Sequence, residues 1–175
     1  MASILNVDKI RAAGGTTNVI DIDSSCNTTA LTIDSSGRVL RPVIPYAFAT
    51  FANSGAYVSV SADSILDFSV AAVNDGNHYN TSTYKFVCPV DGLYTVECST
   101  LTQTNGDAYS LQPARNSGGT VVEVGRFYTR DRALSGSMTI KCSANDELYM
   151  ITSHTKSFYK STVEPYSWVT YTFIG

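Results

Sequence analysis

Few side chains in this sequence could perform chemistry, and none of them lies in a catalytic motif. The two histidines are His78, in a polar turn, and His154, between two hydroxyl residues. The chain contains no P-loop, no GxGxxG and no GxSxG pattern. The carboxylates of Asp21, Asp23 and Asp34 could form an acid–base pair, but they lie in Ser-rich turns, which favours solvated loops. We therefore assign no catalytic residue and expect a protein that is not an enzyme.

One loop offers oxygen ligands to a hard cation. Asn74, Asp75 and Asn77 lie close together in the sequence, and carboxylate and amide oxygens are the ligands that calcium prefers. The loop supplies fewer ligands than calcium usually takes, and Asn-Asp-Gly is also an ordinary turn sequence. A calcium site at Asp75 and Asn77 and a plain turn both stay open, and we expect no other cofactor.

The four cysteines, Cys26, Cys88, Cys98 and Cys142, do not form a metal-binding pattern. No CxxC pair occurs, whereas a zinc site needs closely spaced Cys or His ligands. Cys88 and Cys98 lie in strand-like stretches, and a reducing origin favours buried free thiols over a disulfide between them. The disulfide state of all four cysteines stays open at this point.

Composition and charge exclude several classes of partner. Charged residues make up only 15% of the chain, the net charge is −3, and Lys and Arg are scattered. A nucleic-acid-binding surface needs clustered Lys and Arg, so we expect no nucleic-acid partner. No apolar run is long enough to span a bilayer, and the first residues lack the basic and apolar regions of a signal peptide. We therefore expect no membrane insertion and synthesis in a cytoplasm.

The elements that must position any site are short β-strands. Thr, Ser, Val and Tyr are abundant and suit pleated, half-buried surfaces, and no segment shows a helical period. Turn sequences such as residues 74–77 and 116–119 separate stretches in which apolar and polar residues alternate. The expected strands are Tyr46–Phe51, Ile65–Val70, Tyr84–Val87, Gly92–Thr102, Ala108–Arg115, Val121–Tyr128, Ser137–Cys142, Glu147–Thr152 and Trp168–Ile174. This spacing predicts an all-β protein with an antiparallel β-sandwich.

Residues 1–44 differ in texture from residues 45–175. They carry no aromatic side chain and contain a repeat, residues 19–26 and 30–37, in which each copy runs from a short alternating strand into Ile-Asp-Ser-Ser. The two prolines of residues 41–45 form a stiff connector that excludes helix and disfavours strand pairing. We therefore expect an N-terminal β stalk or attachment segment over residues 1–44 and a separate head over residues 45–175.

The strands of this repeat need a partner to cover their apolar side chains. Ile20 and Ile22 lie on one face of the first copy, and Leu31 and Ile33 on one face of the second. An isolated hairpin is marginally stable in water, so another surface must cover these side chains. Other copies of the segment around a threefold axis are favoured, and a hairpin packed on the head is the alternative.

Residues 73–80 and 84–94 resemble the C1q/TNF-like jelly roll. That family has an Asn-rich turn and a Tyr, followed by Phe-x-Cys/Ala-Pro-x-x-Gly-x-Tyr at the start of a long central strand, as residues 86–94 read here. Residues 145–149 resemble the family's Gly-Asp-x-Val turn and residues 167–175 its closing strand, whose usual Phe-x-Gly-x-Leu pattern is broken here. The resemblance implies a jelly-roll sandwich that packs as a homotrimer. The residues expected to hold its structural core are Phe86, Pro89, Gly92, Tyr94, Trp168 and Phe173.

Residues 3–10 and 31–39 resemble segments that precede receptor-binding heads in bacteriophage tail fibres and related virion appendages. Together with the head, this resemblance implies a non-enzymatic trimeric structural protein on the exterior of a phage virion, as a head decoration protein or short fibre. It would bind other virion proteins through its N-terminal segment. The short chain disfavours a full tail fibre. A receptor-binding fibre tip and a C1q-like binding module from a cell remain the alternatives.

Loops at one end of the sandwich are the expected place for recognition, because loops tolerate variation while strands hold the core. Two segments combine aromatic and polar residues, the turn of residues 75–79 and a predicted loop over residues 156–161. Their expected partner is a host-surface glycan or protein, or a neighbouring capsid subunit. The alternative places Phe158 and Tyr159 at the interface between subunits of the trimer. The candidate binding residues are His78, Tyr79, Phe158, Tyr159 and Lys160.

Overall fold

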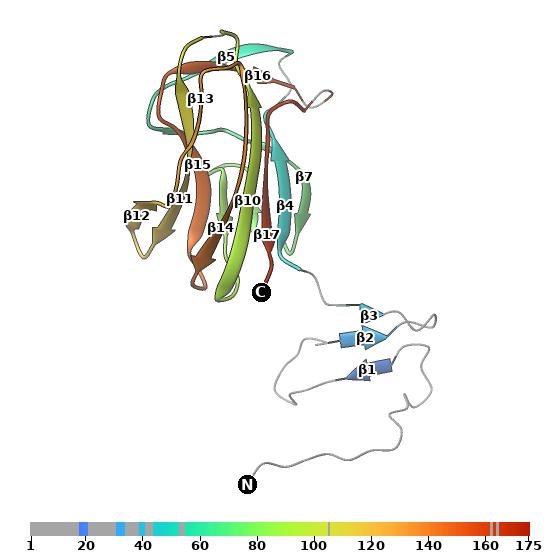
Figure 1. Ribbon diagram of the computed structural model, residues 1–175. Coiled ribbons are helices and arrows are strands. Elements are labelled where there is room, and N and C mark those ends of the chain that lie inside the picture. The colour runs from blue at the N-terminus through green and yellow to red at the C-terminus, as the bar shows by residue number, and fades with distance from the viewer. Residues whose placement is uncertain are drawn as a thin grey trace. The chain divides into compact units, whose positions relative to one another are not determined.

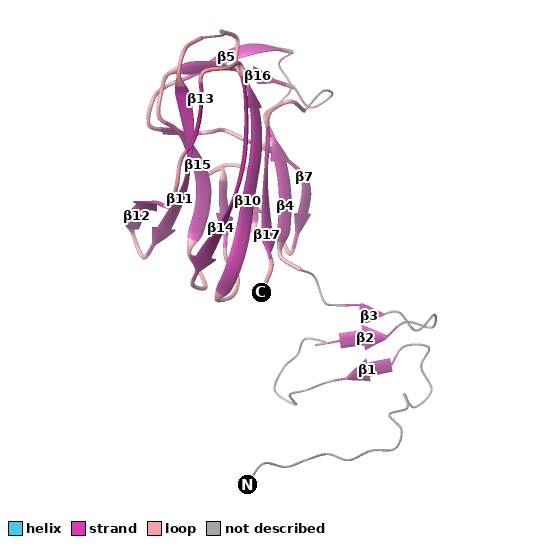
Figure 2. Ribbon diagram, viewed as in Figure 1, coloured by secondary structure: helices cyan, strands magenta, loops and turns pink. Residues whose placement is uncertain are grey.

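The structure is a computed structural model in which every regular element of the described residues is a β-strand (Figure 2). It describes residues 18–20, 31–33 and 39–40, and residues 44–175 except 53, 54, 105, 162 and 164. The chain divides into two compact units, Met1–Ile44 and Pro45–Gly175. In this described part, no helix is long and apolar enough to cross a membrane.

The N-terminal unit contains a small antiparallel sheet in the order β1-β2-β3. The strands are β1 (Asn18–Ile20), β2 (Leu31–Ile33) and β3 (Val39–Leu40). The two strands that pair over the longest register, β1 and β2, come from the two copies of the sequence repeat, and Val19 lies opposite Thr32. Ile22, which was predicted to share a face with Ile20, lies outside the described residues, and so do the two Asp-Ser-Ser segments. The threefold arrangement of this segment stays a prediction.

One layer of the head is a five-stranded antiparallel sheet in the order β14-β10-β17-β4-β7. Strand β10 runs antiparallel to its neighbours β14 and β17, so that Tyr94 lies opposite Ile140 on one side and Phe173 on the other. The strands are β4 (Tyr46–Thr50), β7 (Val70–Asp75), β10 (Gly92–Leu101), β14 (Ala133–Cys142) and β17 (Trp168–Phe173).

The other layer follows the order β12-β11-β15-β9-β8, with β13 paired to β11 and β6 paired to β15. Its strands are β6 (Ser64–Ile65), β8 (Tyr79–Asn80), β9 (Lys85–Val87), β11 (Tyr109–Ser117), β12 (Thr120–Glu123), β13 (Phe127–Thr129) and β15 (Glu147–Thr152). A separate two-stranded ribbon pairs β5 (Ala56–Val60) with β16 (Lys156–Lys160). The two layers confirm the predicted all-β antiparallel sandwich.

The chain enters and leaves the head at the same end. The Phe173 amide donates to the Pro45 carbonyl at 3.0 Å, and the Ile174 amide donates to the Leu93 carbonyl at 2.9 Å. The ribbon of β5 and β16 lies at the opposite end of the head (Figure 1). Any partner that approaches this far end therefore meets the ribbon and its neighbouring loops.

The core between the layers is built on stacked aromatic rings. Phe86 and Tyr94 have no exposed surface, and Phe86 stacks on Tyr171 with ring centroids 5.3 Å apart. Phe173 is partly buried and packs against this core from the end of the closing strand. Trp168, which was predicted to lie in the core, instead stands at the start of the same strand on its outward side and is partly exposed. These rings dominate the packing between the two layers, because aromatic side chains bury the largest apolar areas.

Three predicted elements differ from the structure. The strand expected over residues 65–70 is short β6 followed by an irregular segment, and the strand expected over residues 121–128 is divided into β12 and β13. The loop expected over residues 156–161 is wrong, because this segment forms strand β16. In each case the strand boundaries were predicted from side-chain types alone. Strand preference depends on tertiary context, so these types do not show where a neighbouring strand supplies hydrogen bonds.

We expect the head to lose stability in acid through Glu147. The Lys85 ammonium and the Asn116 amide each donate to the Glu147 carboxylate at 2.7 Å, which lowers the pKa of this carboxyl group below its ordinary 4.5. A depressed pKa gives stability that is present above the unfolded-state pKa and is lost as the pH falls through the folded-state pKa. Urea denaturation midpoints should therefore fall below about pH 4.5, and Glu147→Gln should flatten that decline. An unchanged decline in the variant would show that other carboxylates carry it.

Candidate functional site

The turn predicted to bind a partner is held by its own hydrogen bonds. The Tyr79 ring is buried, and its hydroxyl donates to the Phe68 carbonyl at 2.8 Å. Burial raises the pKa of the Tyr79 phenol. The Asn74 side chain closes the turn, since its Nδ2 donates to the Tyr79 carbonyl and its Oδ1 accepts from the Tyr79 amide, both at 2.9 Å. Tyr79 is therefore a packing residue of this chain and presents almost no surface to a partner.

The same geometry bears on the calcium prediction. The side-chain oxygen of Asn74 is used by the turn, and Asp75 and Asn77 are both exposed. Between residues 44 and 175, wherever the structure is described, no three acidic, His or Cys side chains gather into a cation-binding group. His78 is partly exposed and packs edge-on against Phe86 with ring centroids 6.0 Å apart. The observed hydrogen bonds favour the turn interpretation.

Strand β16 places its predicted binding residues on two different faces. Phe158 has no exposed surface and lies in the core, and Lys160 is buried, forms an ion pair with Asp67 and lies over the Phe51 ring at 4.8 Å. Tyr159 lies between these two residues in the strand and is partly exposed. Because side chains alternate along a strand, the segment offers Tyr159 to solvent while Phe158 and Lys160 hold the fold.

Tyr159 belongs to a row of three tyrosines that we call the tyrosine row, made of Tyr57, Tyr159 and Tyr166. Tyr57 and Tyr159 lie opposite each other across β5 and β16, and their ring centroids are 5.2 Å apart. The Tyr166 ring lies 5.9 Å from the Tyr159 ring and is about half exposed. Serines 59 and 157 form the neighbouring cross-strand pair, so the outward face of the ribbon continues from aromatic rings to hydroxyl groups.

An arginine lies at one end of the tyrosine row. The Arg132 guanidinium carbon is 5.8 Å from the Tyr57 ring centroid, and its Nη2 donates to the Tyr57 hydroxyl. The Arg132 Nε donates to the Thr102 carbonyl at 3.1 Å, which fixes the guanidinium in place. Arg132 is itself exposed, so a positive charge stands beside an aromatic surface.

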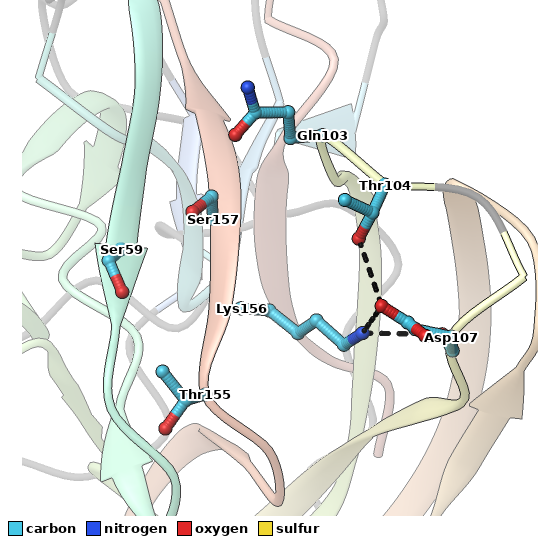
Figure 3. Close-up of a pocket in the computed structure, with 7 residues that line it drawn as sticks. All are labelled: Ser59, Gln103, Thr104, Asp107, Thr155, Lys156 and Ser157. Atoms are coloured by element: carbon cyan, nitrogen blue, oxygen red, sulfur yellow. Dashed lines mark hydrogen bonds and ion pairs between the residues drawn. The ribbon is translucent and has the colours of Figure 1, made fainter.

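A polar pocket adjoins the serine pair (Figure 3). Its volume is about 150 Å³, and Figure 3 shows side chains of the ribbon on one side facing Gln103, Thr104 and Asp107 on the other. The Lys156 Nζ reaches across to Asp107 at 3.5 Å, and the Thr104 hydroxyl donates to the same carboxylate at 3.5 Å. The pocket is lined by hydroxyl, amide and paired charged groups: Ser59, Gln103, Thr104, Asp107, Thr155, Lys156 and Ser157.

The outward side of the five-stranded sheet forms a second surface, which we call the low-charge face. It consists of the outward residues of β14, β10, β17, β4 and β7, many of them Ser and Thr, and the charged residues among them are Asp75, Glu97 and Lys141. Phe48 and Trp168 lie on this face, partly exposed, with ring centroids 6.0 Å apart. The face therefore carries few charged residues and an aromatic pair.

The described cysteines are not placed to act as nucleophiles. Cys88, Cys98 and Cys142 are free and buried, while Cys26 lies outside the described residues. Burial raises the pKa of the Cys98 thiol to about 12, and the Cys142 side chain and burial raise the pKa of the Cys88 thiol. Since the thiolate is the reactive form, Cys88 and Cys98 are inert, whereas the Cys88 side chain lowers the pKa of the Cys142 thiol, and burial keeps this thiol from solvent.

Residues 47–175 match the sequence pattern of the C1q domain family. Among the curated proteins compared with the chain, none matches. The Phe86–Tyr94 stretch quoted above falls inside the matched residues, and so do the tyrosine row, the polar pocket and nearly all of the low-charge face.

Three solved structures illustrate the fold that the head shares. The Eiger TNF from S. frugiperda has a TM-score of 0.63 at 15% identity, covering 77% of this chain and 94% of that chain. The globular domain of zebrafish complement 1qA has a TM-score of 0.57 at 15% identity, covering 75% and 98%. Murine APRIL, at pH 8.0, has a TM-score of 0.56 at 9% identity, covering 74% and 98%. The C1q/TNF-like jelly roll predicted from the sequence is confirmed.

Proposed function

The chain belongs to the C1q domain family, and we propose that it is a homotrimeric structural protein on the exterior of a bacteriophage particle, whose head binds the host surface or neighbouring capsid subunits. Domains of the C1q/TNF family are non-enzymatic globular binding modules that typically form homotrimers. This agrees with the described side chains, which form hydrogen bonds and packing contacts suited to holding a fold. The observation that carries the trimer for this chain is the low-charge face.

The low-charge face has the composition of a surface that becomes buried. Charged residues are depleted and aromatic residues enriched at the centre of subunit interfaces, and this face carries Phe48 and Trp168 but few charged residues, namely Asp75, Glu97 and Lys141. Tyr46 lies on the same strand as Phe48, and burial together with the Glu97 and Asp75 charges raises the pKa of its phenol. A threefold arrangement of three such faces would cover the aromatic pair in each subunit.

We expect the purified chain to show a mass of about 56 kDa by light scattering, three times the 18.8 kDa of one chain. Phe48→Lys should shift the mass to that of one chain, because three ammonium groups would meet in a desolvated interface. Val121→Lys is the matched control, since Val121 is an exposed apolar residue on β12 of the other layer. That variant should keep the trimer mass. A parent chain of 18.8 kDa at micromolar concentration would overturn the trimer.

The virion location rests on the N-terminal segment. Residues 3–10 and 31–39 are similar to segments that precede receptor-binding heads of phage fibres, and we propose that they attach the trimer to other virion proteins. A head decoration protein or short fibre is favoured over a long fibre tip. Electron microscopy of intact particles labelled with an antibody to the head distinguishes these positions. Label on the capsid supports decoration, label on the tail supports a fibre, and unlabelled particles contradict the proposal.

A further inference from the structure

The tyrosine row and the polar pocket form one continuous surface on the β5–β16 ribbon. The cross-strand pair Tyr57 and Tyr159 is followed along both strands by the pair Ser59 and Ser157, and both serines line the pocket. The ribbon lies at the end of the head opposite its two chain termini (Figure 1). A ligand can therefore lie along the ribbon from ring to pocket without a break in contact.

The tyrosine rings suit the flat, weakly polar face of a sugar ring. Tyrosine supplies a large contact area with few rotamers to freeze, and its hydroxyl remains available for hydrogen bonds. The rings are already fixed before a ligand arrives, because Tyr57 accepts a hydrogen bond from Arg132 and Tyr159 packs between Tyr57 and Tyr166. Such preorganisation lowers the entropy cost of binding.

The pocket suits hydroxyl groups rather than an apolar ligand. Ligand pockets usually combine a mainly apolar lining with a few polar groups, whereas every residue lining this pocket is polar (Figure 3). Its volume of about 150 Å³ is smaller than the ~300–1,000 Å³ of sites that enclose a whole small molecule. It therefore fits one ring of a longer chain whose other units stay outside.

Charge selects among sugar chains. The Lys156 ammonium in the pocket is paired with Asp107, so the pocket itself is close to neutral. Arg132, at the other end of the tyrosine row, is exposed and uses its Nε and Nη2 on Thr102 and Tyr57. A carboxylate on the ligand would complement this guanidinium.

We propose that the β5–β16 ribbon binds an oligosaccharide, with one sugar ring stacked on Tyr159 and in side contact with Tyr57, whose ring plane is inclined at 57° to that of Tyr159, and with the next sugar ring in the polar pocket. An acidic sugar is preferred, because its carboxylate faces Arg132. This inference rests on the proposed function, because it assumes that the head is a binding module. It adds the class of partner, an oligosaccharide. The site is complete within one chain, so it does not depend on the trimer.

The test is binding of the full-length chain to an array of immobilised bacterial oligosaccharides that includes neutral and uronic-acid-containing chains. We expect binding, with Tyr159→Ala reducing it about tenfold or more, as for a central aromatic contact. Tyr159→Phe keeps the ring and should stay within about threefold of the parent. Arg132→Gln should reduce binding to acidic chains more than binding to neutral ones. Tyr128→Ala is the matched control, since Tyr128 is an exposed tyrosine on β13 that also contacts an arginine, Arg130.

Three results would overturn the proposal. The first is a folded trimer that binds no oligosaccharide on the array, an outcome that leaves the trimeric binding head intact and points to a protein partner. The second is a Tyr128→Ala variant that loses as much binding as Tyr159→Ala, because adhesion through any exposed tyrosine would then explain the signal. The third is a Tyr159→Ala variant that dissociates by light scattering, because the row would then be a subunit interface. A monomeric parent that still binds oligosaccharide would contradict only the proposed trimer.

Discussion

Replacing Phe86 with alanine is expected to lower the free energy of unfolding by about 3–5 kcal/mol. The side chain has no exposed surface, stacks on Tyr171 at 5.3 Å and meets Tyr94 edge-on at 5.9 Å. Truncation removes the transfer free energy of the ring and leaves a cavity between two layers whose strands cannot close it. Urea denaturation followed by tyrosine and tryptophan fluorescence measures the change.

A variant at the neighbouring Tyr171 ring serves as the control. It shows whether a loss of stability comes from lost packing or from any substitution in the core. The Tyr171 hydroxyl is fully buried and has no hydrogen-bond partner among the described residues, and burial raises the pKa of its phenol. Tyr171→Phe keeps the ring and removes an unsatisfied polar group, so the free energy of unfolding should stay the same or rise. A midpoint that is unchanged in Phe86→Ala, or a large loss in Tyr171→Phe, would contradict this description of the core.

The sequence was sufficient for the fold wherever a strand keeps strict alternation. In β10, Tyr94, Val96 and Cys98 are buried while Leu93 and Glu97 are exposed, which is the pattern that predicted a half-buried strand at this place. The resemblance of residues 86–94 then selected the jelly roll among all-β folds. The alternation and the motif both lie within one short stretch of the chain, so a single sequence is enough to detect them.

Strand β16 shows why alternation can fail. Its sequence, Lys-Ser-Phe-Tyr-Lys, looks like a polar loop, yet Phe158 and Lys160 point inward. Lys160 is tolerated there because Asp67, far away in the sequence, supplies the counter-charge and the Phe51 ring lies beneath the ammonium. Neither partner can be inferred from the residues that flank Lys160.

The candidate site was only partly visible in the sequence for the same reason. Tyr159 was singled out as an aromatic residue in a polar segment, and it lies on the exposed ribbon face. Its neighbour Tyr57 comes from a distant segment and meets it through the register of β5 with β16, and Arg132, in the loop before β14, contacts Tyr57. A cross-strand pair is a property of register, which one sequence does not specify.

The turn at Asn74 illustrates the opposite case, in which one sequence supports two interpretations. Asn-Asp-Gly serves equally well as a turn or as part of a cation loop. The structure shows the Asn74 amide bonded through both its nitrogen and its oxygen to the Tyr79 backbone, which accounts for Asn at this position by the turn alone. Side-chain oxygen atoms become informative only when their hydrogen-bond partners are known.

The second large effect is expected at Gly92, where β10 begins. The backbone φ is +154°, and a Cβ atom built at this position would lie 2.6 Å from the Phe173 ring and 2.7 Å from the Gly175 carbonyl oxygen. Gly92→Ala should therefore cost roughly 1–3 kcal/mol for overpacking, with about 1–3 kcal/mol more for the backbone conformation. The Phe173 ring also contacts Tyr94 at 5.2 Å, so any movement that relieves the clash disturbs the core.

Gly119→Ala is the control that isolates the close approach at Gly92. Gly119 also has a positive φ, +91°, but a Cβ atom there would meet nothing within 4 Å, so its variant carries the backbone cost alone. We expect Gly92→Ala to be the less stable of the two in urea, and its Ile174 amide to exchange faster with deuterium, because this amide bonds the carbonyl of Leu93. Equal losses of unfolding free energy in the two variants would show that the end of β17 moves away from the added methyl group at no cost in stability. The packing at Gly92 instead holds the end of β17 against the start of β10, since Gly92 leaves room for both the Phe173 ring and the Gly175 carbonyl.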